Sequence, residues 1–210
     1  MNTLNTESVR RYYNFWGKRY DWFSFYEAKA KERALELLDL KPGHKVLNVG
    51  LGTGKDQLQI LDQVAPGGTA FGVDVSPEML QTALKRTGPT LVEADGRSLP
   101  FSNGSFDRLY SAYTLDLIPS TDLLDMLTGF RRVLKPGGQM VLLSLTEGVS
   151  FTSRAFVSVW KTAYSVSPIT CGGCRPLVLT ELVRKAGFTI LLREVVVQFA
   201  VPSEICVAGH

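Results

Sequence analysis

Residues 46–54 read VLNVGLGTG, an apolar run followed by three glycines at alternate positions. The apolar run predicts a buried strand, and residues 55–64 predict a helix directly after the glycines. Glycine tolerates a positive φ and has no Cβ, so Gly50, Gly52 and Gly54 would let a ligand lie against the backbone. In an open parallel sheet such a loop lies beyond the carboxyl end of a strand, where ligands bind. The alternative is a tight turn that binds nothing.

Strands and helices alternate on both sides of this loop. Expected strands span 44–49, 69–75, 90–93, 106–111, 139–145, 189–198 and 204–208. Expected helices span 28–40, 55–64, 76–85, 120–134, 151–167 and 178–185. Ser76 is a good N-cap before Pro77, the turn at 135–138 should end a helix, and Pro202 and Ser203 should lie near the last bend. This alternation predicts βαβ units and a parallel sheet.

Length and composition are those of one globular domain. The chain has 210 residues, of which 45% are hydrophobic and 20% charged, and its net charge is 23 − 20 = +3. That charge is too small to predict nucleic-acid binding. No apolar run approaches the roughly 20 residues that span a membrane, and the first residues lack an apolar signal core, so we expect a cytoplasmic protein. Three cysteines do not make a disulfide framework.

Two acids, one at the end of the second strand and one after the third, suit a nucleoside. Asp74 lies 20 residues after Gly54, where a carboxylate can accept hydrogen bonds from both ribose hydroxyls. Asp95 follows the third strand and could accept from the exocyclic amine of adenine. The alternatives are a helix N-terminal charge for Asp74 and a turn residue before Gly96 for Asp95. Asp56 argues against phosphate, since it follows the glycine loop and would repel an anion.

Seven motifs in this order resemble the class I S-adenosylmethionine-dependent methyltransferases, and more narrowly their ubiquinone/menaquinone-biosynthesis C-methyltransferases. The resemblance covers roughly residues 20–208 and implies S-adenosylmethionine as cofactor. It also implies an α/β fold: a Rossmann-like, seven-stranded, mostly parallel sheet with the last strand antiparallel and helices on both faces. The motifs that carry the resemblance are Tyr20-Asp21, residues 46–54, 73–80 and 94–101, Phe106-Asp107, residues 132–138 and Ala186-Gly187-Phe188.

The resemblance also implies roles for individual residues. Gly50, Gly52 and Gly54 would line the cofactor, and Asp74 would hold its ribose. The remaining implied contacts are the adenine neighbours Val75, Met79, Asp95 and Gly96, the methionine neighbours Ser111 and Ala112, and Tyr20, which would help to close the site.

Asn48 departs from the family, which usually has an acid at this position to help hold the methionine ammonium. An asparagine oxygen accepts a hydrogen bond but carries no charge, and charge-assisted bonds are about twice as strong as neutral ones. We therefore expect either weaker cofactor binding or a compensating acid elsewhere, with Asp116 and Asp21 as candidates.

Methyl transfer from a sulfonium needs positioning more than a protein nucleophile. If the acceptor must lose a proton, Asp116 is the candidate base, with Tyr113 a weaker one. The alternatives are a loop acid and a packed aromatic ring. Cys171 and Cys174 suggest a metal only superficially, because the other sulfur and imidazole groups lack metal-ligand spacing, and no metal site is expected.

We expect one domain over residues 1–210, with an aromatic lid at 1–40, a cofactor-binding core at 41–145, and an acceptor-pocket segment with closing strands at 146–210. The lid aromatics could instead be core packing, and Arg10, Arg11, Lys18 and Arg19 among them could touch a membrane surface without stable insertion. A small, apolar or aromatic acceptor, such as a quinol or phenol, is the first hypothesis. An amine or phospholipid head group, a non-catalytic S-adenosylmethionine-binding protein and a nicotinamide-dependent oxidoreductase are the alternatives.

Overall fold

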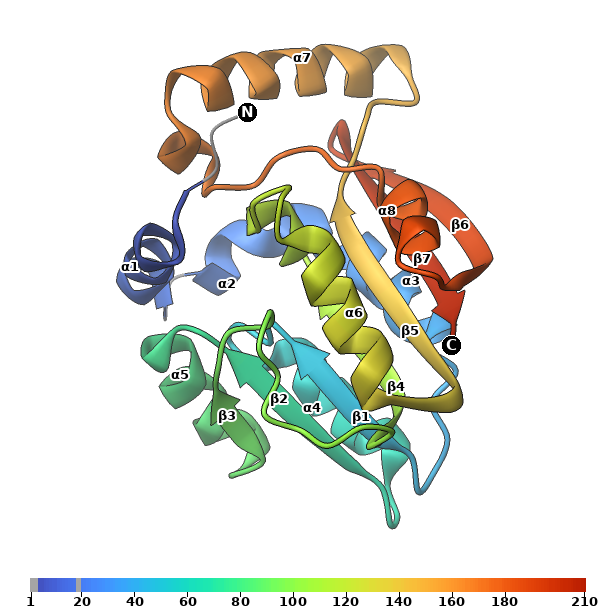
Figure 1. The fold of residues 1–210 in the computed structure, drawn as a ribbon. Coiled ribbons are helices and arrows are strands. Elements are labelled where there is room, and N and C mark those ends of the chain that lie inside the picture. Colours follow the sequence, from blue (N-terminus) through green and yellow to red (C-terminus); the bar gives the residue numbers. More distant parts are fainter. Residues whose placement is uncertain (1–3, 18–19) are drawn as a thin grey trace.

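Seven strands form one sheet, in the order β3-β2-β1-β4-β5-β7-β6 (Figure 1). The computed structural model describes residues 4–17 and 20–210. β7 is antiparallel to both β5 and β6, while the other strand pairs are parallel. This confirms the expected fold class. The strands are β1 (Lys45–Val49), β2 (Thr69–Asp74), β3 (Leu91–Glu93), β4 (Phe106–Ala112), β5 (Leu134–Leu145), β6 (Thr189–Gln198) and β7 (Val201–Gly209).

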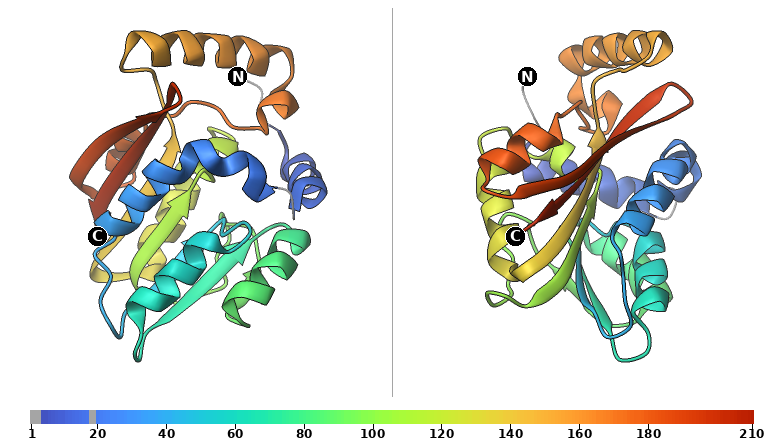
Figure 2. Two further views of the ribbon diagram at one scale, coloured as in Figure 1. Left: turned by 180° about the vertical axis from the view of Figure 1, so that it is seen from behind. Right: turned by 90° about the vertical axis from the view of Figure 1, so that its right-hand side faces the viewer.

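Helices cover both faces of the sheet (Figure 2). α3 and α4 pack on one face, and α6 and α8 pack on the other. The helices are α1 (Thr6–Trp16), α2 (Tyr20–Phe23), α3 (Ala28–Leu37), α4 (Lys55–Val64), α5 (Pro77–Thr87), α6 (Leu123–Val133), α7 (Phe151–Val166) and α8 (Leu179–Lys185). Short 3₁₀ helices span Ser24–Glu27, Leu115–Leu117 and Pro168–Cys171.

The strands bury apolar side chains on both faces, as a covered parallel sheet requires. In β1, Val46 belongs to the core beneath α3 and α4, whereas Leu47 belongs to the core beneath α6 and α8. In β5, Val141 and Leu142 divide in the same way. This alternation fixes the register of each strand, because a slip of one residue would exchange the two cores.

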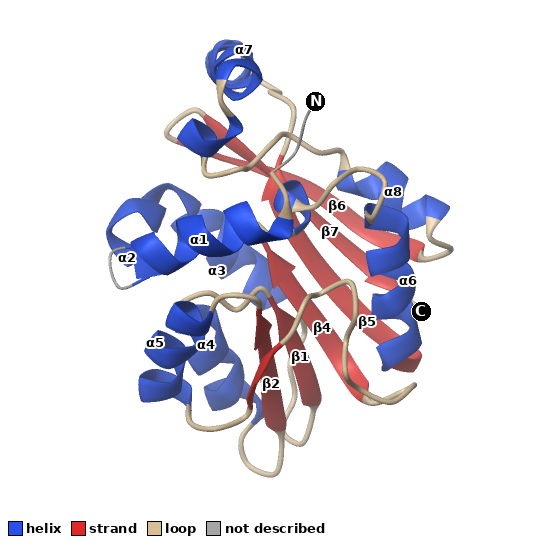
Figure 3. Ribbon diagram, turned by 60° about the vertical axis from the view of Figure 1, so that its left-hand side comes forward, coloured by secondary structure: helices blue, strands red, loops and turns tan. Residues whose placement is uncertain are grey.

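The strand order brings four loops to one edge of the sheet. The carboxyl ends of β3, β2, β1 and β4 lie side by side, and α1 lies beyond them (Figure 3). Ser76 caps α5 as predicted, because its Oγ accepts a hydrogen bond from the Met79 amide at 3.2 Å. The loops that follow β1 and β2 therefore enter their helices at this edge.

The last hairpin differs from the expectation. Its turn is formed by Phe199 and Ala200, both at positive φ, and Pro202 and Ser203 lie within β7. Pro202 is tolerated there because β5 pairs with β7 only from Ser203 onward, so the missing amide of proline interrupts no bond to β5. Pro202 therefore lies near the bend, as expected, but β7 begins at Val201 rather than at residue 204.

A turn was expected at residues 135–138, between the helix and the next strand, but these residues belong to β5. β5 begins at Leu134, which pairs with Phe106, and the register shifts before Arg108 pairs with Gln139. The extra residues form a bulge in which Gly137 takes a φ of +74°. The segment ends α6, as predicted, while remaining inside the strand.

Candidate cofactor and acceptor site

A cavity opens beyond the carboxyl ends of β1 to β4. The loops after these strands line it, and so do Thr6, Val9 and Tyr13 of α1, which lies beyond these loops (Figure 3). Its described lining residues lie between Leu4 and Met126, so the segment 146–210 contributes none of them. The acceptor-pocket role expected of this segment stays a prediction.

The three glycines of the loop have different surroundings, so a side chain would meet different atoms at each. A Cβ on Gly52 would meet no atom within 4 Å, although Gly52 lines the cavity with a φ of +57°. A Cβ on Gly50 would lie 2.0 Å from Thr114 Oγ1, and one on Gly54 would lie 2.9 Å from the Cβ of Ala83 in α5. Gly52 therefore leaves space for a ligand, whereas Gly54 allows two helices to approach.

Asp74 is the best-placed acid at the cavity. Its Oδ2 accepts a hydrogen bond from the Gly52 amide and its Oδ1 accepts one from the Ser76 amide, each at 2.9 Å. Burial raises the pKa of Asp74, against the opposing effect of these amides. The carboxylate joins the loops after β1 and β2 and lines the cavity together with Val75 and Met79.

Asp95 and Gly96 also line the cavity, but Asp95 has a partner that sequence analysis missed. The Arg97 guanidinium donates to both carboxylate oxygens, at 3.0 Å and 2.6 Å, and lowers the pKa of Asp95. Arg97 also donates to Thr6 Oγ1 at 2.6 Å and forms an ion pair with Asp122. The side chain thus links the loop after β3 to the start of α1.

Asn48 and Ser111 lie beneath the loop and do not line the cavity. Asn48 is only 1% exposed, and its Nδ2 has no hydrogen-bond partner among the described residues. The Ser111 hydroxyl donates to the Val49 carbonyl at 2.9 Å, which supports the end of β1. Ala112, the next residue, does line the cavity.

The two candidate catalytic residues have separate positions. Tyr113 lines the cavity at a φ of +52°, and its hydroxyl is hydrogen-bonded to Ser203 Oγ at 2.6 Å. Asp116 is fully buried outside the lining, and burial raises its pKa to about 7. Arg175 donates to the Asp116 carbonyl at 3.0 Å rather than to the carboxylate.

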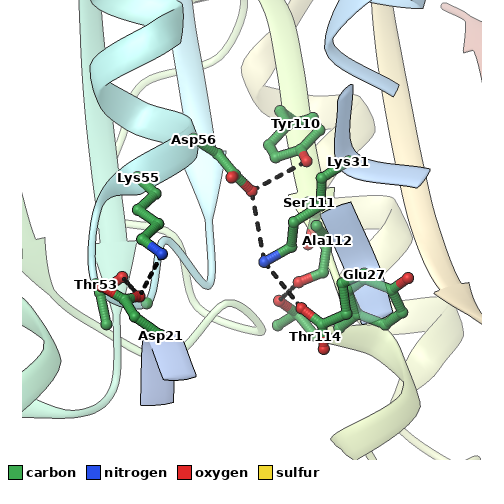
Figure 4. Close-up of polar contacts among 12 residues, drawn as sticks. Asp21, Glu27, Lys31, Thr53, Lys55, Asp56, Tyr110, Ser111, Ala112 and Thr114 are labelled. Atoms are coloured by element: carbon green, nitrogen blue, oxygen red, sulfur yellow. Dashed lines mark hydrogen bonds and ion pairs between the residues drawn. The ribbon is translucent and has the colours of Figure 1, made fainter. Parts of the chain in front are cut away.

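A charged cluster at the inner end of the cavity was missed entirely (Figure 4). Lys31 Nζ lies 3.0 Å from Glu27 Oε2 and 3.8 Å from Asp56 Oδ2, and Tyr110 donates to Asp56 at 3.1 Å. Burial opposes the charge on Lys31, but Asp56 and Glu27 outweigh it and raise the lysine pKa. On the sequence, Lys31 looks like one more charge on the exposed face of a helix, so only its position in the fold reveals it.

Asp21 joins the start of α2 to the glycine loop. It accepts a hydrogen bond from Thr53 Oγ1 at 2.6 Å and pairs with Arg86 at 2.7 Å. Burial opposes the charge on Asp21, yet Thr53 and Arg86 outweigh it and lower its pKa. The side chain of Tyr20, like Lys18 and Arg19, lies outside the described residues, so its expected role stays a prediction.

The outer part of the cavity is apolar. Leu4, Val9 and Tyr13 of the N-terminal segment face it together with Leu117 and Ile118. Tyr13 is backed by the 171–174 loop, because its hydroxyl donates to the Gly172 carbonyl at 3.5 Å. The predicted α7 helix forms, but it lies at the far end of the molecule (Figure 1) and lines no part of the described cavity.

Two further observations concern only the part of the chain that the structure describes. It holds no group of three or more His, Cys, Asp or Glu side chains arranged to bind a metal ion. None of its helices combines the length and the apolar character that crossing a bilayer requires.

Solved structures resemble this fold along most of the chain. A Haloferax volcanii methyltransferase, in complex with the Trm112 methyltransferase activator, superimposes with a TM-score of 0.74 at 19% identity, covering 94% of this chain and 96% of that one. A S-adenosylmethionine-dependent methyltransferase from Aquifex aeolicus gives a TM-score of 0.61 at 20% identity, covering 85% and 88%.

Sequence comparison identifies the family. Residues 46–138 match the family model described as "Methyltransferase domain". The demethylmenaquinone methyltransferase of Staphylococcus aureus (strain JH9) is 32% identical over 174 residues, covering 79% of this chain and 68% of that protein. With the glycine loop and Asp74 at the predicted edge of the sheet, these matches show that the chain belongs to the class I S-adenosylmethionine-dependent methyltransferases.

Proposed function

We propose that this enzyme methylates a small apolar or aromatic acceptor of the quinol or phenol class. The observation that carries the proposal is the apolar outer part of the cavity, which continues directly from the glycine loop. A similarity to demethylmenaquinone methyltransferase supports the same class of acceptor. The acceptor would enter beneath α1, against Leu4, Val9 and Leu117.

The residues present fit the cofactor. Gly52 leaves room against the backbone, and Asp74 offers a carboxylate for the ribose hydroxyls. Asp95, Gly96, Val75 and Met79 would surround adenine. When bound, S-adenosylmethionine supplies an electrophilic methyl group on its sulfonium. The apolar walls exclude water and hold the acceptor in line, which is the main contribution that a protein makes to such a displacement.

We propose different roles for the two candidate catalytic residues. Tyr113 lines the cavity and its hydroxyl is held by Ser203 at 2.6 Å, so it would act by shaping the wall against which the acceptor lies. Asp116 lies behind the wall, where its carboxylate is within 3.5 Å of the Leu145 amide. It would therefore act on the acceptor only indirectly, as a positioning residue for the segment that follows β4.

The test is transfer of a radiolabelled methyl group from S-adenosylmethionine to a panel of acceptors. The panel contains a short-chain demethylmenaquinol kept reduced with dithionite, a catechol and an amine such as histamine. We expect transfer to the quinol or the catechol, with the methylated atom identified by mass spectrometry and NMR. Transfer to the amine alone would contradict the proposal and favour N-methylation.

A further inference from the structure

The position that normally carries an acid in this family is neutral here and lies outside the cavity. Asn48 pairs with Tyr110 across β1 and β4, so the two side chains point toward the same face of the sheet, beneath α3 and α4. The amide of Asn48 is buried, and its Nδ2 has no hydrogen-bond partner in the part of the chain that the structure describes. Asn48 thus supplies no charge to the methionine end of a cofactor.

Charge is supplied instead from the two helices above this point. Asp56, in the first turn of α4, is held by the Tyr110 hydroxyl, and Lys31 of α3 reaches toward it (Figure 4). Both side chains line the cavity, with 15% of Asp56 and 23% of Lys31 exposed, while Glu27 is almost completely covered behind Lys31. The carboxylates of Glu27 and Asp56 therefore both contact the Lys31 ammonium. Of these three groups, Lys31 and Asp56 face the cavity.

The order of the strands places this pair at a definite end of the ligand. Asp95 follows β3 and Asp74 is the last residue of β2, so adenine and ribose would lie over the ends of those strands. The next groups along the ligand must extend over β1 and β4. Lys31 and Asp56 lie there, beside Ala112 and Tyr110.

We propose that Lys31 and Asp56 recognise the amino-acid end of S-adenosylmethionine and replace the missing acid at position 48. The Lys31 ammonium binds the methionine carboxylate, and the Asp56 carboxylate binds the methionine ammonium. Glu27 keeps Lys31 in place from behind, and Tyr110 orients Asp56. Charge-assisted bonds of this kind contribute about 1.5–3 kcal/mol each, which corresponds to roughly 10- to 100-fold in affinity.

The test separates recognition of the amino-acid group from general support of the site. Calorimetric titrations compare S-adenosylhomocysteine with 5′-methylthioadenosine, which has the same nucleoside but no amino-acid group. We expect Lys31→Met and Asp56→Asn each to weaken S-adenosylhomocysteine binding at least about tenfold while changing methylthioadenosine binding less than about twofold. Lys29→Met, on the exposed side of the same helix, is the matched control and should change neither.

A third ligand assigns the two residues separately. Decarboxylated S-adenosylhomocysteine keeps the ammonium and lacks the carboxylate, so Lys31→Met should no longer weaken binding, whereas Asp56→Asn still should. The wild-type protein gives a check that does not depend on whether the variants fold. It should bind the decarboxylated ligand at least about tenfold more weakly than S-adenosylhomocysteine. Equal losses for all three ligands, or no loss in either variant, would overturn the assignment. None of these outcomes depends on the methyl acceptor.

Discussion

Asp74 shows how one carboxylate can organise a site before any ligand binds. It accepts amide hydrogen bonds from Gly52 and Ser76, so it fixes two loops whose ends must both meet the cofactor. Its position at the end of β2 made it predictable, because the spacing from the glycine loop is set by one βαβ unit. Lys31 and Arg97 were not predictable, because their partners are distant in sequence and come together only in the folded chain.

Asp74→Ala should weaken S-adenosylhomocysteine binding by about 1.5–3 kcal/mol, the usual scale for hydrogen bonds to a charged group. Calorimetric titration measures this change. Asp74→Asn controls for the loop, because an amide oxygen can still accept one of the two backbone bonds. An unchanged affinity in the alanine variant would show that the ribose lies elsewhere.

Gly52 and Gly54 should respond to substitution in different ways. Gly52→Val places a side chain in open cavity space, so it should abolish cofactor binding, and valine at a φ of +57° should also lower stability. Gly54→Ala forces a Cβ against Ala83, so it should lower the melting temperature more than it weakens cofactor binding. Thermal denaturation and titration of both variants check this contrast. A Gly52→Val protein that still binds cofactor would contradict the loop assignment.

Asp116 should make stability depend on pH. Its pKa is raised to about 7 in the folded protein by burial, so folding favours the protonated form. Stability should therefore fall as pH rises from the ordinary aspartate pKa through about 7. Asp116→Asn should remove this loss and be about 1–3 kcal/mol more stable than wild type at pH 8, with a smaller difference at pH 5. Urea unfolding at both pH values measures it, and a variant that is less stable at pH 8 would show that burial does not disfavour the charged carboxylate.

Among the secondary-structure elements, the N-terminal helix is the one whose role sequence patterns left open. Its dense aromatic residues fitted both a lid and core packing, and the lid stays a prediction. Val9 is buried and lines the cavity, while Phe15 is 71% exposed. Polar contacts decide its position, since Asn14 Oδ1 accepts a hydrogen bond from Ser76 Oγ at 2.6 Å, and no periodicity could reveal that pair.

Asn14→Ala should loosen α1 without disturbing the sheet, because Ser76 keeps its backbone cap on α5. We expect the amides of α1 to exchange hydrogen about five- to tenfold faster, as loss of a hydrogen bond of about 1 kcal/mol implies. Hydrogen-exchange mass spectrometry reports this, with α7 as the internal reference. Equal acceleration in both helices would indicate general destabilisation instead.

Over the whole molecule, the sheet was predictable because its cores repeat one pattern. Apolar strands bounded by glycine and proline turns alternate with amphipathic helices, and only doubly covered parallel sheets satisfy that pattern. The exceptions, the bulge at 135–138 and the start of β7, occur where pairing to a neighbouring strand overrides the local preference of proline. The sequence predicted where the cavity lies but not all of the residues that line it, because its walls combine α1, α3 and α4 with four loops.

Cofactor binding should stabilise the molecule as a unit, because its contacts join both ends of the cavity. S-adenosylhomocysteine at about 100 times its dissociation constant should add about 2.7 kcal/mol to the free energy of unfolding. For a chain of this length that is a rise of roughly 5–10 °C in melting temperature. Scanning fluorimetry with NADH at the same concentration is the control, and a shift with NADH alone would contradict the cofactor assignment.

The antiparallel strand also determines when this protein can fold during its synthesis. β7 lies between β5 and β6, so β6 has no partner in the sheet until residues 201–209 have been made. A ribosome-bound chain that ends earlier presents the unpaired edge of β5 to any other nascent strand. Ser203, which holds the Tyr113 hydroxyl at the cavity wall, arrives with the same segment. Completion of the sheet and of the wall is therefore a single late event, and the domain reaches its working form only after nearly all of it has left the exit tunnel.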